Sequence, residues 1–424
     1  MRRPSFHQRG GPIRTRSFRL FTADFGKLPV NIVGVFPVNS PTMFARRLPP
    51  PDVSFFLLGA RGTGKTTWIQ QHFAEAAHYD LLLSSESMRL SRDPSLFRAE
   101  CYAQPDGAWI VVDEIQRVPA LLDEVQHLMG RKRQRFVLSG SSARKLRRSG
   151  TNLLAGRAET RHMFPLVSAE VGDQRELDAV LTNGMLPLAV TRTRPAQFLS
   201  SYCEVYLHQE IQAEALVRQI GPFARFLEVA ARMNGQTTNV AGIARDAGIA
   251  RQTAQEFFQI LVDTLLASWL PAWKAKPGVK QVAHPKFYLF DSGVARQLTG
   301  QAHLPLTGAD RGFLFETFLL HEMRAFLHYA EREWPVCYWK THDGAEVDFV
   351  VDGPKGLTAI EAKSVDRWDP KWNASLRKFR ELHGKAARAM YGVYAGERAL
   401  QLDGITVLPW RQFLQRLWSD DLFT

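Results

Sequence analysis

The sequence predicts an α/β protein in which a parallel-sheet domain is followed by helical segments and then by a second α/β domain. Three short apolar runs near the front, at residues 53–59, 108–112 and 136–141, alternate with helical patterns. This alternation is typical of parallel sheets with crossover helices. The last third combines a long amphipathic helix, expected at 313–330, with alternating strand patterns. These observations predict the fold class.

Residues 56–68 read FLLGARGTGKTTW and contain a complete phosphate-binding pattern, G-x-x-x-x-G-K-S/T. The apolar run at 53–59 supplies the strand before it, and a helix is expected at about 65–77. Glycines let backbone amides turn toward phosphates, and the helix N-terminus adds partial positive charge. Lys65 is expected to reach the β and γ phosphates, and the Thr66 hydroxyl to ligate Mg²⁺. The predicted ATP-binding residues are Gly59, Arg61, Gly62, Thr63, Gly64, Lys65, Thr66 and Thr67.

The second half of such a site is a strand that ends in acid, and residues 108–129 provide one. Ile110 to Val112 lead into Asp113 and Glu114, and a helical pattern follows. Asp113 is expected to hold Mg²⁺ through water, and Glu114 to orient or deprotonate the attacking water. The alternative is that these acids cap the following helix.

Two further residues extend the predicted catalytic set of Lys65 and Glu114. The strand at 136–141, FVLSGS, ends in small polar side chains, so Ser139 or Ser141 is expected to sense the γ phosphate. Arg157 lies in LAGRAE and is interpreted as an arginine finger or nucleotide sensor that acts across a subunit boundary. The alternative for Arg157 is a solvated loop side chain.

Residues 160–220 are expected to be mainly helical and to form a lid or connector. Residues 236–273 then predict a helix-turn-helix, with a turn at Gly248 and a longer second helix that carries Phe257, Leu261 and Leu265. The segment KFYLFD, 286–291, would add strands and complete a winged helix. The predicted DNA-contacting side chains at the start of the second helix are Arg251, Gln252, Thr253 and Gln255. A winged helix that serves only as a packing module is the other interpretation.

The last third carries a second set of chemically active side chains. Glu361 and Lys363 are two residues apart in IEAKS and therefore lie on one face of a strand, as Glu346 and Asp348 do in the strand before it. A hairpin turn at 352–356 can bring Asp348 beside Glu361, where two carboxylates would hold a divalent metal and Lys363 would position a water. This is the residue set of the PD-(D/E)xK nuclease core. A surface salt-bridge network on a hairpin is the alternative.

Composition sets outer limits on these interpretations. The chain has 424 residues, enough for several cores, and three widely separated cysteines, which predict neither a zinc site nor a disulfide framework. No apolar stretch reaches the length of a membrane span, so a soluble protein of the reducing cytoplasm is expected.

The net charge of +12 is concentrated near the N-terminus. Residues 1–50 hold nine of the 54 Lys and Arg side chains and one of the 42 Asp and Glu side chains. This basic extension, which we expect to be disordered, could be a nucleic-acid-binding arm, a transit peptide, or an upstream segment before a natural start at Met43. Within the first domain, two basic runs flank the strand at 136–141 and favour either a solvated surface or contact with phosphates: Arg131, Lys132, Arg133 and Arg135, and Arg144, Lys145, Arg147 and Arg148.

From about residue 50 to 415 the chain resembles bacterial and archaeal AAA-like ATPases that join a P-loop domain to a C-terminal domain of uncharacterised function, with a winged helix and a restriction-endonuclease-like fold. The matching segments are LLGARGTGKTT, VVDEIQRVPALLDEVQ, FVLSGSS, LAGRAE, FPLVSAE, KFYLFDSGVA, FETFLLHEM, AEVDFVV and AIEAKS.

The resemblance implies an ATP and Mg²⁺ site at Gly62, Gly64, Lys65, Thr66, Asp113 and Glu114, and a second metal site at Glu316, Asp348, Glu361 and Lys363. The predicted organisation is an extension at 1–50, a P-loop ATPase core at 51–170, a helical lid at 171–220, a winged helix at 221–300 and a nuclease-like domain at 301–424. The resemblance does not explain the basic extension.

The first predicted function is ATP-driven movement or remodelling of duplex or branched DNA, in which the nuclease-like domain grips DNA. This function implies assembly of identical subunits, with a hexameric ring as one form. The alternatives are a nucleotide-switched regulatory or defence ATPase and an ATP-controlled, metal-dependent DNA nuclease.

Overall fold

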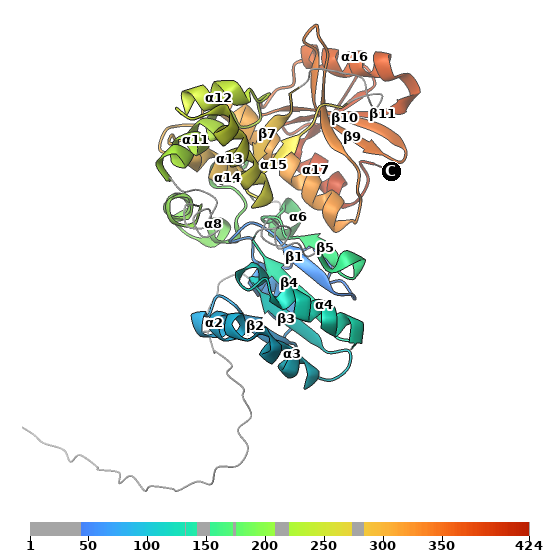
Figure 1. Ribbon diagram of the computed structural model, residues 1–424. Helices are drawn as coiled ribbons and strands as arrows, with labels where there is room; N and C mark the ends of the chain where they lie inside the picture. The colour runs from blue at the N-terminus through green and yellow to red at the C-terminus, as the bar shows by residue number, and fades with distance from the viewer. Residues whose placement is uncertain are drawn as a thin grey trace, which may run out of the picture. The chain divides into compact units, whose positions relative to one another are not determined.

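The first domain is built on a five-stranded sheet in the order β2-β3-β4-β1-β5 (Figure 1). All of its paired strands are parallel, as the sequence predicts. The computed structural model describes residues 44–131, 133–141, 153–172, 175–207, 220–273 and 284–423. The strands are β1 (Phe55–Leu58), β2 (Ala77–Asp80), β3 (Trp109–Asp113), β4 (Arg135–Gly140) and β5 (Glu159–His162). Because β4 lies between β1 and β3, the phosphate-binding loop and the acidic strand flank the serine-bearing strand.

Helices cover both faces of this sheet because alternate strand residues point to opposite sides. Phe56, Leu58 and Ile110 share one core with the helices that follow β2 and β3. Phe55 and Leu57 share the other core with Trp68 of the helix after β1. The helices are α1 (Lys65–His72), α2 (Ser84–Arg92), α3 (Pro94–Tyr102) and α4 (Leu121–Arg131).

The helix expected at 65–77 is shorter than predicted. It ends at His72, and the chain turns back at Phe73 to enter β2. The alanine-rich sequence after Phe73 favours helix, but Tyr79 pairs with Val112 of β3 and is buried in the sheet core. Pairing and burial therefore outweigh local helix propensity.

The boundary predicted at residue 50 is wrong, because residues just before it belong to the fold. Leu48 is buried in the core beside Trp68. Arg46 forms a buried ion pair with Glu170, in which its Nε lies 3.0 Å from Oε2. The predicted extension up to residue 43 and the basic run at Arg144, Lys145, Arg147 and Arg148 lie outside the described residues.

The described part of the connector from residue 168 onward is helical, as expected, whereas the start of the predicted segment belongs to β5. Its helices are α6 (Ser168–Val171), α7 (Leu177–Asn183), α8 (Pro187–Thr191), α9 (Pro195–Ser201) and a π-helix (Tyr202–Leu207). Gly184 after α7 has a φ of +67°, and a Cβ there would lie 1.9 Å from Asp291 Oδ1. Asp291 accepts a 2.6 Å hydrogen bond from the Met185 amide and also caps the later helix α14 (Ser292–Leu298). Glycine at 184 therefore permits close packing between the connector and α14.

Three helices and a two-stranded antiparallel sheet follow the connector: α11 (Ile220–Arg232), α12 (Val240–Asp246), α13 (Arg251–Asp263), β6 (Ala267–Leu270) and β7 (Lys286–Leu289). The turn predicted at Gly248 is present, with a φ of +65°. Leu265, assigned by its spacing to the second helix, lies beyond the end of α13 with a φ of +60°. Phe257 and Leu261 are buried on α13 as expected.

The last domain holds a six-stranded mixed sheet in the order β12-β13-β11-β10-β9-β8. Its strands are β8 (Val336–Lys340), β9 (Glu346–Gly353), β10 (Gly356–Lys363), β11 (Ala387–Tyr394), β12 (Leu400–Leu402) and β13 (Ile405–Pro409). The predicted hairpin is correct, since Gly353 pairs with Gly356 in an antiparallel register. Residues on one face pack with α16 (Asn373–His383), and those on the other pack with α15 (Gly308–Tyr329) and α17 (Trp410–Trp418).

Helix α15 begins earlier than the expected residue 313 and joins the last domain to the first. Its residues Ala325 and Tyr329 belong to the same core as β1 and α1. None of the described helices, α15 included, is long and apolar enough to span a membrane.

A buried carboxyl group of α15 is hydrogen-bonded to two other elements at this junction. Glu322 of α15 accepts hydrogen bonds from the Ser168 amide at 2.7 Å, from the Ser168 hydroxyl at 3.0 Å and from Trp418 Nε1 at 2.7 Å. Burial raises the pKa of Glu322 to about 7, although these hydrogen bonds oppose the rise. A raised carboxyl pKa means that the native state holds the proton more tightly than the unfolded chain. Its stabilising contribution is therefore full below pH 4.5 and is lost as the pH rises through about 7.

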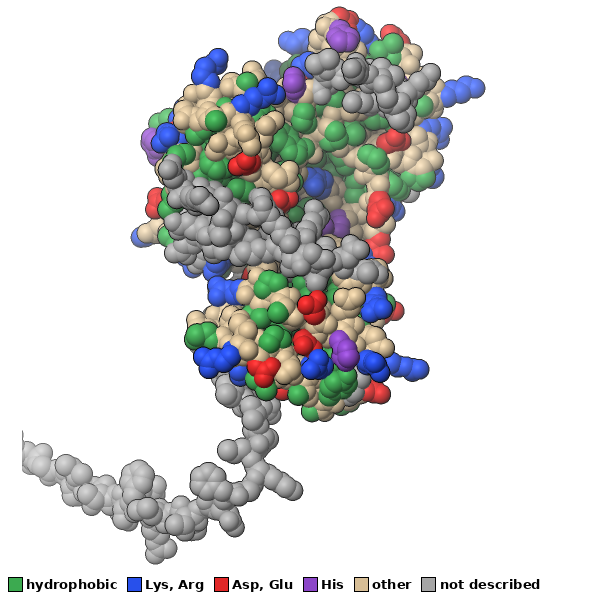
Figure 2. Space-filling model, viewed as in Figure 1, with side chains coloured by type: hydrophobic (Ala, Val, Ile, Leu, Met, Phe, Trp, Pro, Cys, Tyr) green, Lys and Arg blue, Asp and Glu red, His purple; other side chains and the backbone are tan. Residues whose placement is uncertain are grey.

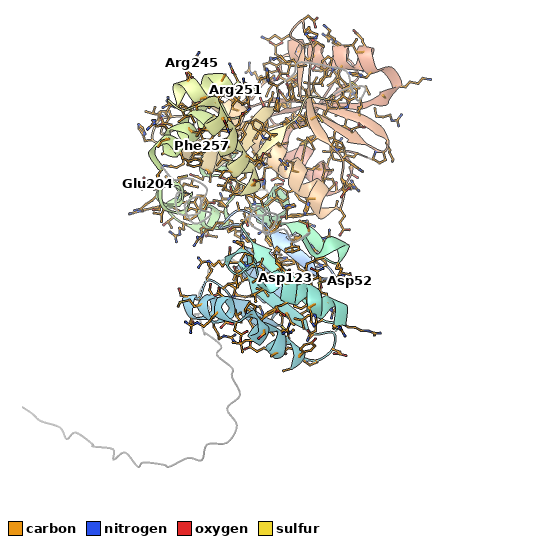
Figure 3. All side chains as sticks on the ribbon, in the orientation of Figure 1. Asp52, Asp123, Glu204, Arg245, Arg251 and Phe257 are labelled. Carbon is orange, nitrogen blue, oxygen red and sulfur yellow. The ribbon has the colours of Figure 1, made fainter. Side chains whose placement is uncertain are left out.

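We expect Glu322→Gln to remove this pH dependence. Between pH 4.5 and about 7, the wild type should lose up to about 3 kcal/mol of unfolding free energy relative to the variant. Urea unfolding at several pH values measures the difference. Glu204→Gln, at an exposed position of the connector labelled in Figure 3, is the control and should show no such trend. A difference between Glu322→Gln and wild type that does not change with pH would contradict the assignment.

Candidate functional site

The phosphate-binding loop lies between the end of β1 and the start of α1. Gly62 and Gly64 have φ values of +81° and +95°, which side-chain-bearing residues rarely adopt. Gly59 is required for a different reason, because a Cβ there would lie 2.5 Å from the Met163 carbonyl oxygen. The glycines of the motif are thus explained by backbone conformation and close packing.

Lys65 and Thr66 begin α1 and differ in their surroundings. Lys65 is 6% exposed, and its Nζ donates to the carbonyl oxygens of Gly59 at 2.7 Å and Ala60 at 3.4 Å. The Lys65 ammonium group is thus held by carbonyl oxygens of the phosphate-binding loop. A nucleotide phosphate would replace these carbonyl oxygens as its acceptor. Thr66 is exposed, and its Oγ1 donates to Asp113 Oδ2 at 2.9 Å. Thr67 and Arg61 are also exposed, and Thr63 is buried with its hydroxyl on the Ala60 carbonyl at 2.9 Å.

Asp113 connects the loop to the neighbouring strand. Besides accepting from Thr66, it accepts a hydrogen bond from the Ser139 hydroxyl through Oδ1. The strand register explains this contact, because Val112 pairs with Leu138 and the next residues on both strands are then side by side. A threonine hydroxyl beside an aspartate is a donor set that suits Mg²⁺. Ser139 donates to Asp113 and accepts a 3.2 Å hydrogen bond from the Glu114 amide, and its role as a phosphate sensor stays a prediction.

Glu114 has an unusual backbone conformation, with a φ of +58°. Non-glycine residues in this region cost of order 1–3 kcal/mol and are concentrated at functional sites. Gln116 is buried and donates through Nε2 to Glu114 Oε2 and to the Ser141 hydroxyl, the latter at 3.1 Å. Gln116 therefore orients the glutamate. Its place two residues after Glu114 in DEIQR was the available signal, but the sequence did not assign it a role.

Two residues outside the motif hold the loop from either side, and neither was predicted. Arg46 Nη1 donates to the Thr63 carbonyl at 2.6 Å, and its Nη2 donates to the Phe164 carbonyl at 2.7 Å. Tyr202 of the connector donates to the Arg61 carbonyl at 2.9 Å. An arginine in a basic segment and a tyrosine in a helical one give no local sign of such contacts.

Arg157 is separate from this network within the chain. It is exposed, and its Nη1 donates to the Gln126 carbonyl of α4 at 3.4 Å. A role on a neighbouring subunit therefore stays a prediction.

The predicted acidic set of the last domain does come together. Lys363 Nζ lies 2.5 Å from Glu361 Oε1 and 3.5 Å from Asp348 Oδ2, as expected from the hairpin. Glu316 of α15 accepts a 2.7 Å hydrogen bond from the Tyr288 hydroxyl. We call Glu316, Asp348, Glu361 and Lys363, together with Glu346, the acidic cluster.

A second lysine, which was not predicted from the sequence, enters the acidic cluster. Lys286 of β7 is 4% exposed, and its Nζ lies 2.6 Å from Glu346 Oε1, 3.7 Å from Glu316 Oε2 and 4.0 Å from Asp348 Oδ1. Burial opposes its charge, but the three carboxylates raise the pKa of Lys286 above its usual value. Lys286 thus adds a second ammonium group, besides that of Lys363, to these acids.

The acidic cluster retains an excess of carboxylates. Burial and then the Asp348 charge raise the pKa of Glu316 to about 7 and that of Glu361 to about 8. Glu361 Oε2 is buried and has no hydrogen-bond partner. Among the described residues, no group of three or more His, Cys, Asp or Glu side chains is arranged to hold a metal ion. The second metal site therefore stays a prediction.

The predicted DNA-contacting residues share the first turns of α13. Arg251, Gln252 and Gln255 are exposed and Thr253 is partly buried, whereas Phe257 on the same helix is buried (Figure 3). Helix α13 therefore presents a polar, basic start and an apolar inner face.

Comparison with known proteins supports an assignment for the first domain. Residues 53–172 match the family model of an AAA domain. Residues 174–304 match a domain of unknown function, DUF8612, and residues 311–413 match another, DUF4143. Uncharacterised proteins of Mycobacterium tuberculosis and Mycobacterium bovis are each 27% identical to the chain over 375 residues, which cover 86% of this chain and 82% of theirs.

Solved structures give weaker similarities. The Aeropyrum pernix ORC2 protein in its ADP form has a TM-score of 0.29 and 13% identity, over 59% of this chain and 87% of that one. The Aeropyrum pernix ORC1 protein in complex with DNA has a TM-score of 0.24 and 12% identity, over 60% and 86%. At these TM-scores the similarity carries no conclusion about fold or function. The AAA-domain match supports an AAA-like, nucleotide-dependent ATPase.

Proposed function

We propose that the chain hydrolyses ATP at the loop of residues 59–67 and uses the energy to move or remodel duplex or branched DNA. One observation carries the hydrolytic part. The hydroxyl of Thr66, the carboxylate of Asp113 and the hydroxyl of Ser139 are joined by hydrogen bonds, and Glu114 follows directly. This arrangement supports a phosphate-bound metal held beside a carboxylate that acts as base.

Each residue then has a distinct task. Lys65 exchanges its carbonyl partners for the β and γ phosphate oxygens. Mg²⁺ would bind the Thr66 hydroxyl and, through water, Asp113, and would neutralise charge on the phosphates. Glu114 accepts a proton from the attacking water, while Gln116 fixes the direction of its carboxylate.

Substitutions in the site separate binding from hydrolysis. We expect Lys65→Ala to lose nucleotide binding, because the loop then lacks its buried cation. We expect Glu114→Gln to bind ATP normally and to hydrolyse it at least about 100-fold more slowly, because the general base is gone. Fluorescent-nucleotide titration and phosphate release measure the two effects.

The matched control is Asp123→Asn, which removes an exposed acid from α4 of the same domain (Figure 3). It should bind and hydrolyse ATP as the wild type does. Wild-type turnover by Glu114→Gln would show that Glu114 is not the base.

The DNA part of the proposal rests on α11 to α13 with β6 and β7. The order of three helices and an antiparallel strand pair is typical of a winged helix, in which the second helix of the helix-turn-helix enters the major groove. Arg251 and Gln252 are exposed at the start of that helix, where base edges or phosphates would be reached.

We expect Arg251→Ala to weaken duplex binding by about five- to tenfold, because one charged contact to DNA is lost. Fluorescence anisotropy at two salt concentrations measures it. Arg245→Ala is the control, since Arg245 is an exposed arginine of the first helix, α12 (Figure 3). If both variants lost the same amount of duplex affinity, the binding would be general charge attraction. Helix α13 would then not be the helix that enters the major groove.

We further propose that Arg157 couples ATP hydrolysis between neighbouring subunits. Arg157 is exposed on the first domain, so its guanidinium is accessible to a neighbouring subunit in a ring. ATP turnover with and without single-stranded, duplex and four-way-junction DNA separates a DNA motor from a regulatory switch. Stimulation by DNA supports the motor, and slow turnover indifferent to DNA supports the regulatory ATPase.

A nuclease is a second candidate because Asp348, Glu361 and Lys363 lie together. However, Lys286 lies among the same carboxylates and already neutralises part of their charge. We therefore favour DNA grip over cleavage for the last domain.

We expect the wild-type protein not to cleave DNA with Mg²⁺ or Mn²⁺, because the Lys286 ammonium competes with a metal ion for these oxygens. A supercoiled-plasmid nicking assay measures cleavage. Nicking by the wild type that disappears in Lys363→Ala, with ATP hydrolysis unchanged, would establish the nuclease instead.

A further inference from the structure

A cavity of about 460 Å³ lies behind the phosphate-binding loop. Its wall includes Gly59, Ala60 and Thr63 of the loop, both strands β6 and β7, and the part of α15 that extends to His328. The volume is within the range of small-molecule sites, and most of the lining is apolar. A space-filling view shows a hollow in which Lys or Arg and His side chains lie deeper than the surrounding hydrophobic ones (Figure 2).

Arg324 is the unusual residue of this wall. No hydrogen bond or ion pair joins its guanidinium to another described residue, and burial lowers its pKa below the usual value. Arg332, which also lines the cavity, is paired with Asp420. Glu333 lies in the lining too, but it is exposed to solvent. Arg324 is only partly buried, but it lines a mainly apolar cavity and has no ion pair with a described residue, so the cavity is suited to an anion.

Two histidines add neutral polar groups. His321 is 8% exposed, and burial lowers its pKa to about 4. Its Nε2 lies 2.9 Å from the Leu166 carbonyl oxygen, which can only accept, so Nε2 carries the proton and Nδ1 is an acceptor. That Nδ1 is buried and has no partner. A ligand that satisfies it must bring a hydroxyl or N–H donor.

His328 has the opposite tautomer. Burial lowers its pKa to about 3, so the ring is neutral near pH 7. Its Nε2 accepts a 2.7 Å hydrogen bond from the His162 amide, which leaves the proton on Nδ1. The mainly apolar wall thus carries three polar groups. These are the cationic guanidinium of Arg324, the neutral N–H donor of His328 and the neutral acceptor nitrogen of His321.

We propose that this cavity binds a small organic anion whose carboxylate or phosphate group pairs with Arg324, whose apolar body fills the cavity, and whose hydroxyl or N–H donates to His321 Nδ1. Gly59 and Ala60 line the cavity and also accept from Lys65. The cavity and the proposed nucleotide site therefore share the loop as a common wall, so we expect binding of the anion to change the affinity for the nucleotide.

Isothermal titration of the full-length protein tests the proposal with four probes. We expect 4-hydroxybenzoate to bind more tightly than benzoate, which lacks the donor, and about tenfold or more tightly than 4-hydroxybenzamide, which lacks the charge. Phenyl phosphate identifies the head group, since preference for it over benzoate indicates phosphate and the reverse indicates carboxylate.

Arg324→Gln should weaken 4-hydroxybenzoate by about tenfold or more, and Arg324→Lys, which keeps the charge, by less. Arg245→Gln, which removes an exposed arginine from α12, should leave the affinity unchanged. The probe comparison on the wild type needs no variant, so the test stands even if Arg324→Gln fails to fold.

Saturating ADP distinguishes the cavity from the phosphate-binding loop. Residual binding of 4-hydroxybenzoate with an altered affinity supports the proposal, whereas complete displacement places the anion in the loop and overturns it. Equal affinity of wild type and folded Arg324→Gln, or no binding of any probe at millimolar concentration, also overturns it.

Discussion

The nucleotide site depends on one constraint, which is that the carboxyl ends of β1, β3 and β4 meet at the same edge of a parallel sheet. Side chains that are far apart in the sequence can then be joined by short hydrogen bonds, as Thr66, Asp113 and Ser139 are. The position of β4 between β1 and β3 matters because it inserts a serine beside the aspartate. If any one strand shifted its register by a single residue, its side chain would turn to the opposite face and the network would break.

The same edge is tied to the last domain by buried polar groups of α15. Tyr329 accepts from the Phe164 amide at 3.2 Å and from Arg46, while His328 accepts from the His162 amide. A buried polar group is costly unless its partner is in place, so these contacts favour one packing of α15 against the strand edge. Any movement of the loop on hydrolysis would therefore act on α15, which carries Glu316 of the acidic cluster.

The strands and motifs were predictable because their signals are local. The apolar runs at 53–59 and 136–141, the glycines of the loop and the hairpin at 352–356 each determine their own conformation through side-chain size and backbone freedom. Proximity of Asp348 to Glu361 also followed from local pairing. In contrast, the end of α1 at His72 and the position of Leu265 outside α13 were predicted wrongly, because contacts with distant residues outweigh helix propensity there.

The sequence by itself thus determined the phosphate-binding loop, the acidic strand and the hairpin that bears Asp348, Glu361 and Lys363. Only the tertiary structure decided which side chains hold that loop and which cation meets those acids. Arg46, Tyr202, Gln116 and Lys286 have no distinguishing local pattern, and each acts on groups supplied by another element. A long-range contact depends on how whole elements pack, and that information is distributed over the core rather than carried by the residue that makes the contact.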